Sequence, residues 1–301
     1  MSKKILITGG TGFIGRVLCK HLLKAGHTLT VLSRQKPATV KAICGKVEPV
    51  ADLNLLKAHP GFDAVFNLAG EGIADKRWSP ERKASLLDSR VALTLALVSV
   101  IRSWEKLPEV LVSGSAVGFY GDQQDHLVTE DTPPNPEFTH QLCSEWEDAA
   151  LSLQADGVRV CLSRTGLVVG KGGGFLDRMI LPFKLGLGGK LGSGHQYMPW
   201  VHREDVVAGL IWMLENQLSH GPYNMVSPNP VTNEEFTRTL ARVLKRPAIL
   251  PAPAPILKLA LGEMAGLLLT GQKAVPARLQ SDGFEFSHPD LKAALNASVK
   301  K

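Results

Sequence analysis

Three glycines near the start of the chain have the types and spacing needed to bind a pyrophosphate. Gly9, Gly12 and Gly15 follow a short apolar segment, residues 4–8, and precede residues 16–23, whose apolar positions fit a helix. Glycines let a backbone turn tightly and approach a phosphate, and the free N–H groups of a helix N-terminus favour its negative charge. The order strand, glycine turn and helix therefore predicts a dinucleotide phosphate site. A purely structural turn is the alternative.

A hydroxyl and a guanidinium follow the second predicted strand, residues 27–32. Many NAD-specific folds carry an acidic residue at this point to bind the ribose 2′-OH, and its charge would repel a phosphate. This chain has Ser33 and Arg34 instead. Because Arg binds phosphate in a bidentate manner, we expect the cofactor to be NADP (NADPH) rather than NAD. The alternative is a solvated surface Arg at a strand end. Arg16, just past the third glycine, is a second candidate for phosphate contact.

Two more strand ends offer contacts to a nucleotide. Asp52 follows a predicted strand over residues 46–50, and it is equally suited to contact adenine or to cap the helix that follows. Leu68, Ala69 and Gly70 end the next strand. Small residues at the carboxyl end of a parallel strand let a ligand lie against the backbone.

The elements that must position these residues alternate between strand and helix through the first half of the chain. This alternation predicts an α/β fold with a doubly wound parallel sheet and right-handed crossovers. A polar loop, residues 125–136, is expected on the surface over the cleft. After Gly170 the chain becomes glycine-rich and resembles a flexible lid or wall segment. The Pro-rich residues 251–255 mark a boundary before a last helical section.

Composition excludes several classes of function. The 301 residues are 44% apolar and 21% charged, as in an ordinary globular protein. The net charge is +6, but the basic residues are scattered and only 6% of residues are aromatic, so we expect no nucleic-acid partner. The four cysteines form no Cys-x-x-Cys pair and no His cluster has metal-ligand spacing, so no metal is expected. The apolar run over residues 91–101 is too short to span a bilayer, and strand one begins too early for a signal peptide. We expect a cytoplasmic protein without a membrane partner.

Six segments of the sequence match the pattern of a known family: Thr8–Gly15, Asn67–Gly70, the serine-rich end of the strand at 109–113, Trp200–Asp205, Gly188–Gln196 and the tail from about Leu250. With them the sequence resembles the extended short-chain dehydrogenase/reductase superfamily, and more closely its atypical epimerase-family branch. The resemblance covers nearly the whole chain. It implies a Rossmann-type sheet with a smaller C-terminal substrate-binding region: residues 1–170 would form the NADP-binding domain, completed by parts of 195–225, and 171–301 the substrate side and a helical tail.

The resemblance also implies a set of cofactor-binding residues. Arg90 falls where typical members place an Asn on the central helix, and its alternative is a surface cation. Val168 would lie near the nicotinamide, and its alternative is core packing. The complete expected set is Gly9, Thr11, Gly12, Phe13, Ile14, Gly15, Ser33, Arg34, Asp52, Leu68, Ala69, Gly70, Glu71, Arg90 and Val168.

One departure from the family pattern governs the functional interpretation. Active members use a Tyr-x-x-x-Lys pair, in which the Tyr transfers a proton and the Lys lowers its pKa and holds the nicotinamide ribose. None of the three tyrosines here has a Lys four residues later. The expected positions fall near Thr139 and Cys143. Ser115 occupies the place of the family's substrate-orienting Ser, and its alternative role is a helix or turn cap.

Two functions therefore remain open. The first is an NADP(H)-dependent oxidoreductase or epimerase on an unknown small carbonyl or sugar-type substrate, with a substituted acid–base residue. Its candidates, in order, are Ser115, Glu71, Glu145 and His202. The second is a catalytically inactive NADP(H)-binding sensor or partner-binding protein, since the same glycines and Arg34 support both. A homodimer is expected only by analogy with relatives.

Overall fold

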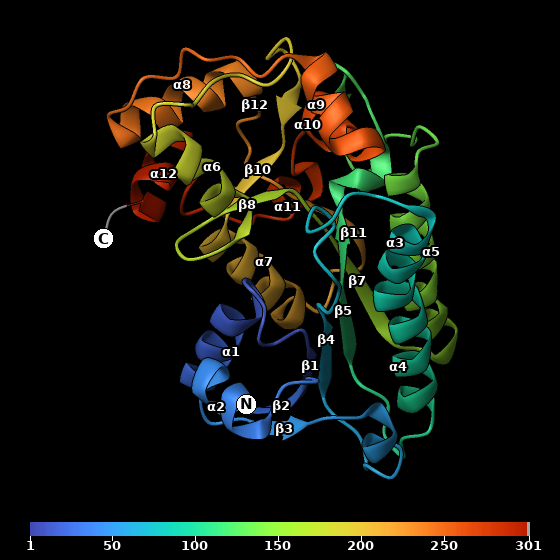
Figure 1. Ribbon diagram of the computed structural model, residues 1–301. Coiled ribbons are helices and arrows are strands. Elements are labelled where there is room, and N and C mark those ends of the chain that lie inside the picture. Colours follow the sequence, from blue (N-terminus) through green and yellow to red (C-terminus); the bar gives the residue numbers. More distant parts are fainter. Residues whose placement is uncertain (300–301) are drawn as a thin grey trace.

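Neighbouring residues of the buried strands point to opposite faces of one sheet, and each face has its own core. The computed structural model describes residues 1–299 (Figure 1). Ile5 and Ile7 pack into one hydrophobic cluster, whereas Leu6 between them belongs to another. In the same way, Val110 and Val112 belong to the first cluster, and Leu111 between them belongs to the second. A strand with apolar residues on both sides must be covered by helices on both sides, as in a doubly wound fold.

The central sheet has seven strands, and all of its pairings are parallel. Its spatial order is β11-β7-β5-β4-β1-β2-β3, so the chain reverses its direction of winding next to β1. Ligands of such sheets bind outside the carboxyl ends of the strands at this switch point. The fold prediction is confirmed. The strands are β1 (Lys4–Thr8), β2 (Thr28–Leu32), β3 (Glu48–Val50), β4 (Ala64–Asn67), β5 (Val110–Ala116), β7 (Arg159–Thr165) and β11 (Gly221–Met225).

Two helical layers enclose this sheet (Figure 1). One cluster joins the sheet to α1 (Gly15–Lys24), α2 (Pro37–Cys44) and α7 (Arg203–Glu215). The other joins it to α4 (Leu93–Arg102) and α5 (Phe138–Leu151). The helix α3 (Pro80–Leu87) continues into α4 through a π-helical turn, Asp88–Ala92. Single π-helical turns within α-helices are frequently found at functional sites.

Among residues 1–299, the helical stretch Pro80–Arg102 is long and apolar enough to cross a membrane, judged by length and composition alone. It is longer than the apolar run recognised in the sequence, because α3 and the π-helical turn extend it. Core helices have the same property. Leu97, Val98 and Ile101 are buried against the sheet, so the stretch is a layer of this fold.

A smaller C-terminal part lies beyond the carboxyl ends of the strands (Figure 1). Its core includes Phe183, Trp200, Phe236 and Leu295. Its helices are α6 (Gly174–Lys184), α8 (Asn233–Leu244), α9 (Ala254–Leu261), α10 (Gly266–Leu269), α11 (Ala277–Ser281) and α12 (Leu291–Val299). Its short strands are β8 (Leu167–Val169), β9 (Tyr197–Met198), β10 (Trp200–His202), β12 (Val231–Thr232) and β13 (Lys273–Ala274), the last paired with β6 (Leu127–Val128).

The expectation that the loop at residues 125–136 covers the cleft is wrong. Its β6 pairs with β13, and Glu130 is buried, where its carboxylate accepts hydrogen bonds from the backbone N–H groups of Asn224 and Arg278. Burial raises the pKa of Glu130. The polar composition of this loop thus serves contacts with the C-terminal segment rather than a lid.

Candidate functional site

The glycine turn between β1 and α1 presses against the backbone of the neighbouring strand end. Gly9 has φ +71°, and a Cβ there would lie 2.6 Å from the carbonyl carbon of Leu68. A Cβ on Gly15 would meet the carbonyl oxygen of Gly9. The N–H of Gly12 donates to that same oxygen at 3.0 Å and closes the turn. Only glycine therefore fits at positions 9 and 15. With this tight turn in place, the free N–H groups at the N-terminus of α1 can bind an anion beside it.

A cavity of about 910 Å³ opens beside this turn, along the carboxyl ends of the first strands. It has the position expected for a dinucleotide in a doubly wound sheet. Predicted cofactor residues on its wall are Gly9, Thr11, Gly12, Ser33, Arg34, Asp52, Leu68, Ala69, Gly70 and Glu71. The sequence did not identify several further wall residues: Gln35, Asn54, Lys57, Ser85, Asp88, Ser89, Ala96 and Ser99. Phe13, Ile14, Gly15, Arg90 and Val168 are not on this wall.

Arg34 stands at the cavity edge as an exposed cation. Within residues 1–299 no carboxylate lies within 4.0 Å of its guanidinium. The N–H of Gln35 donates to the Ser33 hydroxyl at 3.2 Å, which shapes the turn that presents Arg34. The predicted alternative, a solvated Arg, fits its exposure, but its place on the cavity wall favours contact with a bound anion.

Asp52 fulfils one of its two predicted roles and is placed for the other. Its carboxylate accepts a hydrogen bond from the N–H of Asn54 at 2.9 Å and caps the 3₁₀ helix Leu53–Leu56. The residue also lines the cavity. Capping fixes the orientation of the carboxylate, so the two roles are compatible.

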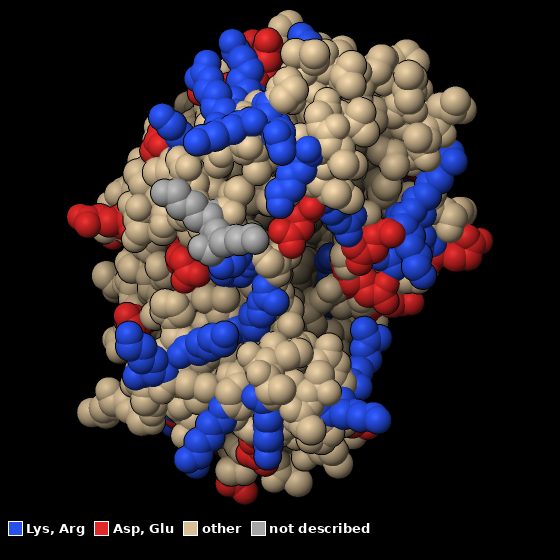
Figure 2. Space-filling model, turned by 60° about the vertical axis from the view of Figure 1, so that its left-hand side comes forward, with Lys and Arg blue, Asp and Glu red and all other residues tan. Residues whose placement is uncertain are grey.

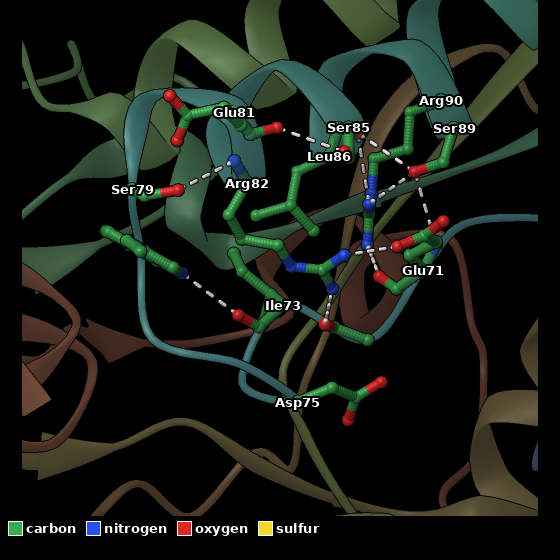
Figure 3. Close-up of polar contacts among 12 residues, drawn as sticks. Glu71, Ile73, Asp75, Ser79, Glu81, Arg82, Ser85, Leu86, Ser89 and Arg90 are labelled. Atoms are coloured by element: carbon green, nitrogen blue, oxygen red, sulfur yellow. Dashed lines mark hydrogen bonds and ion pairs between the residues drawn. The ribbon is translucent and has the colours of Figure 1, made fainter.

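Two arginines from the α3–α4 stretch hold the loop that follows β4 (Figure 3). Arg82, buried to more than nine-tenths, pairs with the Glu71 carboxylate and donates to the carbonyl oxygen of Gly72 at 2.7 Å. Arg90 donates to the carbonyl oxygen of Glu71 at 2.7 Å. The Arg82 hydrogen bond lowers the pKa of Glu71, and the charge of Arg34 adds to the effect. Glu71 is therefore an ionised group held at the cavity wall.

The predicted alternative of Arg90 as a surface cation does not describe its surroundings. Its guanidinium lies 5.4 Å from the centre of the Trp146 ring, and a Cβ on Gly70 would be 3.0 Å from its Cζ. Burial lowers the pKa of Arg90. The π-helical turn thus carries Arg90 against Gly70, which is a wall residue of the cavity.

Ser115 is buried beside a charged pair rather than on the cavity wall. Its hydroxyl donates to Oε1 of Glu147 at 2.6 Å. Arg164 donates to the same carboxylate from Nε at 2.9 Å and from Nη2 at 2.8 Å. Burial alone would lower the pKa of Arg164, but its hydrogen bonds and ion pair with Glu147 raise this pKa overall. No pattern in the sequence marks this pair, because Glu147 and Arg164 belong to different elements.

The positions of the absent Tyr and Lys carry no comparable acid–base group. Thr139 packs against Gly118, and Cys143 is buried. Burial raises the pKa of the Cys143 thiol to about 12, so it remains protonated at neutral pH. Neither side chain is a wall residue of the cavity.

Two other predicted acid–base candidates lie away from the cavity. Glu145 is exposed on α5 and accepts a hydrogen bond from Gln141 at 2.9 Å. His202 caps α7 through Nδ1, which accepts from the N–H of Glu204, and its ring stacks on His288 at 3.8 Å. Burial lowers the pKa of His202 to about 4. These positions leave Glu71 as the predicted candidate that faces the cavity.

One group of side chains in the described chain has the proximity of metal ligands: His202, Asp205 and His288. Its carboxylate oxygens already accept hydrogen bonds, whereas Nδ1 of His288 has no hydrogen-bond partner among residues 1–299. Both oxygens of Asp205 accept backbone N–H groups, from Ser287 at 2.8 Å and His288 at 3.0 Å. A ligating His normally donates from its second nitrogen, whereas Nδ1 of His202 accepts. The group fastens the C-terminal segment to α7.

The glycine-rich segment after β8 packs on Phe13 of the glycine turn, and none of its residues 170–174 lines the cavity. Cβ atoms on Gly173 and Gly174 would lie 2.7 and 2.8 Å from the Phe13 ring. Arg16 donates to the carbonyl oxygen of Gly172, and Arg203 to that of Lys171 at 2.8 Å. Both arginines therefore fasten this segment.

Val168 packs against the core of the α1–α2–α7 face. Its predicted alternative, core packing, is thus what its contacts show. A position near the nicotinamide stays a prediction.

Comparisons with known proteins agree with this geometry. The model of the "NAD dependent epimerase/dehydratase family" matches residues 5–226, and a "Domain of unknown function" model matches residues 252–298. An epimerase family protein of Mycobacterium bovis is 39% identical over 304 residues, with 99% of this chain and 98% of that protein covered. A chloroplastic homologue from Arabidopsis thaliana is 40% identical, covering 98% of this chain and 86% of its own length.

A solved structure is also similar over nearly the whole chain. It is the human epimerase family protein SDR39U1 "with NADPH", with a TM-score of 0.89 and 37% identity, covering 97% of this chain and 98% of that one.

Proposed function

Because the chain belongs to the NAD-dependent epimerase/dehydratase family, we propose that it binds NADPH in the cavity beside its glycine turn. Three features support this proposal. The backbone at Gly9 and Gly15 leaves space that any side chain would fill. The N-terminus of α1 favours a pyrophosphate. Arg34 offers an exposed guanidinium at the ribose end, and this observation carries the choice of NADPH over NADH. The human relative crystallised with NADPH points the same way.

Residues around the cavity would hold the cofactor in an ordered way. The pyrophosphate would lie on the turn Gly9–Gly12, the adenosine ribose and its phosphate by Ser33 and Arg34, and the adenine beside Asp52. Backbone at Leu68 and Ala69 would support the remaining half. When bound, the nicotinamide supplies or accepts a hydride at a substrate carbon.

Replacing Arg34 with Ala is expected to weaken NADPH binding by about 10- to 100-fold, because a charge-assisted phosphate contact contributes roughly 1.5–3 kcal/mol. NADH binding should change less than about threefold, since it lacks the phosphate. Isothermal titration of both cofactors measures this. Lys36→Ala, an exposed cation two residues away, is the matched control. Equal losses for both cofactors in the Arg34 variant would contradict the assigned role.

We further propose that the protein is an oxidoreductase or epimerase acting on a small carbonyl or sugar-type substrate. Glu71 is then the group that accepts a proton, since it is the predicted acid–base candidate on the cavity wall. Its pairing with Arg82 makes it a weaker base than a free carboxylate. The alternative is a non-catalytic NADPH sensor. Two observations favour that alternative. The Ser115 hydroxyl is buried and donates to Glu147 rather than facing the cavity, and the chain has no Tyr–Lys pair.

A screen of carbonyl compounds and sugar nucleotides, followed by NADPH absorbance and by product epimer analysis, separates the two functions. For any substrate found, Glu71→Gln is expected to lower kcat by about 100-fold or more, since general base catalysis contributes roughly 10²–10⁴. Glu145→Gln should leave kcat unchanged within about twofold. Tight NADPH binding without turnover of any compound would favour the sensor.

A further inference from the structure

One face of the C-terminal part combines several cations, three of them without a carboxylate partner, with exposed aliphatic side chains. Two segments form it, residues 178–192 and 236–262. They hold eight of the 34 Lys and Arg residues, and four acidic residues stand just outside their ends: Asp177, Glu234, Glu235 and Glu263. With these four acids counted, the two segments and their ends still have four more basic than acidic residues, out of a net charge of +6.

The two segments lie side by side. The N–H of Leu250 donates to the carbonyl oxygen of Gly188 at 3.1 Å, and the N–H of Ala252 to that of Lys190 at 2.9 Å. In the opposite direction, the N–H of Gly192 donates to the carbonyl oxygen of Ala252 at 2.9 Å. The two segments are therefore neighbours in the fold although they are distant in sequence. We call their joint surface the basic C-terminal face.

Of the cations in these segments, Arg178 pairs with Asp75, whereas three arginines on and just after α8 have no carboxylate partner in the described chain. Arg238 and Arg242 are exposed at i and i+4 on α8, opposite its buried Phe236 and Leu240, and Arg246 follows four residues later. Figure 2 shows Lys and Arg gathered over the upper part of this side of the molecule. Neighbouring like charges on a helix destabilise it. Within residues 1–299 none of the three has a carboxylate within 4.0 Å, unlike Lys83 and Arg102 elsewhere.

Aliphatic side chains stand exposed beside these cations. Leu185, Leu187, Ile249 and Leu250 are each at least half exposed, and α9 continues the surface with Leu259. Scattered exposed apolar residues are ordinary, but a contiguous group rimmed by one sign of charge marks an interaction site. Aliphatic side chains gain nothing from a nucleic-acid backbone. They gain free energy in the acyl boundary of a lipid bilayer, while Lys and Arg are attracted to anionic headgroups.

We propose that the basic C-terminal face docks on the surface of an anionic membrane. The cations contact lipid phosphate and carboxylate groups, and the leucines enter the headgroup region without spanning the bilayer. This departs from the sequence-based expectation of no membrane partner, which rested on spanning segments. The glycine turn and the cavity lie on other elements, so docking is independent of the proposed NADPH site.

Vesicle flotation with the full-length protein tests this proposal. Wild-type protein is expected to float with phosphatidylcholine vesicles containing about one-third phosphatidylglycerol, and to bind pure phosphatidylcholine at least about tenfold less. The double variant Arg238→Glu/Arg242→Glu should lose about 30-fold or more in partitioning. Leu185→Ser/Leu250→Ser should also lose binding. High salt should weaken the wild-type interaction.

The matched control is Lys20→Glu/Lys24→Glu, an equal charge change on exposed residues of α1. It should keep vesicle binding within about threefold. Equal loss in this control would mean that overall charge, not the face, drives binding, and would overturn the proposal. So would equal binding to neutral vesicles or no binding at all. A dimer in size-exclusion chromatography that Arg238→Glu/Arg242→Glu dissociates would instead make the face a self-interface and overturn it. Unchanged NADPH affinity and Tm show that the variants are folded.

Discussion

Glu147→Ala is expected to lower the free energy of unfolding by about 3–5 kcal/mol, because it leaves a buried guanidinium without its carboxylate. Arg164 and Glu147 are each only 5% exposed at the side chain and share two hydrogen bonds. Arg164 also donates to the hydroxyl of Tyr120 at 3.0 Å and lies 3.5 Å from the centre of the Phe119 ring. Those contacts do not neutralise its charge. Urea unfolding followed by circular dichroism measures the loss.

Glu145→Ala provides the control on the same helix, since Glu145 is exposed. We expect it to change the unfolding free energy by less than about 0.5 kcal/mol. Ser115→Ala removes one donor to Glu147 and should cost about 1 kcal/mol. A Glu147 variant as stable as wild type would show that Arg164 finds water or another acceptor, contrary to the buried pair described above.

Gly15→Val is expected to weaken NADPH binding by more than about 100-fold, equivalent to about 2.7 kcal/mol. Any Cβ at this position would overlap the carbonyl oxygen of Gly9, and the Cα of Gly10 lies only 2.8 Å away. These are backbone atoms of the turn itself, so relief of the overlap must displace the N–H groups that face the pyrophosphate. Titration of NADPH monitored by fluorescence gives the affinity.

The control for this variant is Gly266→Ala, because a Cβ there has no heavy atom within 4 Å. It should bind NADPH as wild type does. Circular dichroism of Gly15→Val must still show the α/β fold for the comparison to count. An affinity within about threefold of wild type would contradict the placement of the cofactor on this turn.

The sequence was most informative where a function depends on neighbouring residues. Gly9, Gly12 and Gly15 form a turn within seven residues, and the strand before it and the helix after it are continuous with it. Ser33 and Arg34 were recognised for the same reason, since both directly follow β2. The parallel sheet followed from alternating elements, and its strand order places these ends together.

Contacts between distant segments could not be read in this way. Glu147 and Arg164 sit 17 residues apart on a helix and a strand, and neither is distinguished from a surface charge by its neighbours. Arg82 resembles an ordinary residue in the first turn of α3, yet the fold buries it on Glu71. The polar loop at residues 125–136 was misplaced, because the partner of its buried Glu130 is supplied by the C-terminal segment.

The basic C-terminal face illustrates the same limit for a surface. In sequence order its cations are spread over two segments more than 40 residues apart, and they looked scattered. Backbone hydrogen bonds between Leu250 and Gly188 and between Ala252 and Lys190 bring the segments together. A charge pattern becomes a surface only when the fold is known.

The most direct test of the account is the titration of the unmodified protein with NADPH and with NADH under identical conditions. We predict one site per chain that prefers NADPH by at least about tenfold, because Arg34 supplies a phosphate contact worth about 1.4 kcal/mol or more. Equal affinity for both, a preference for NADH, or no binding of either cofactor would contradict it.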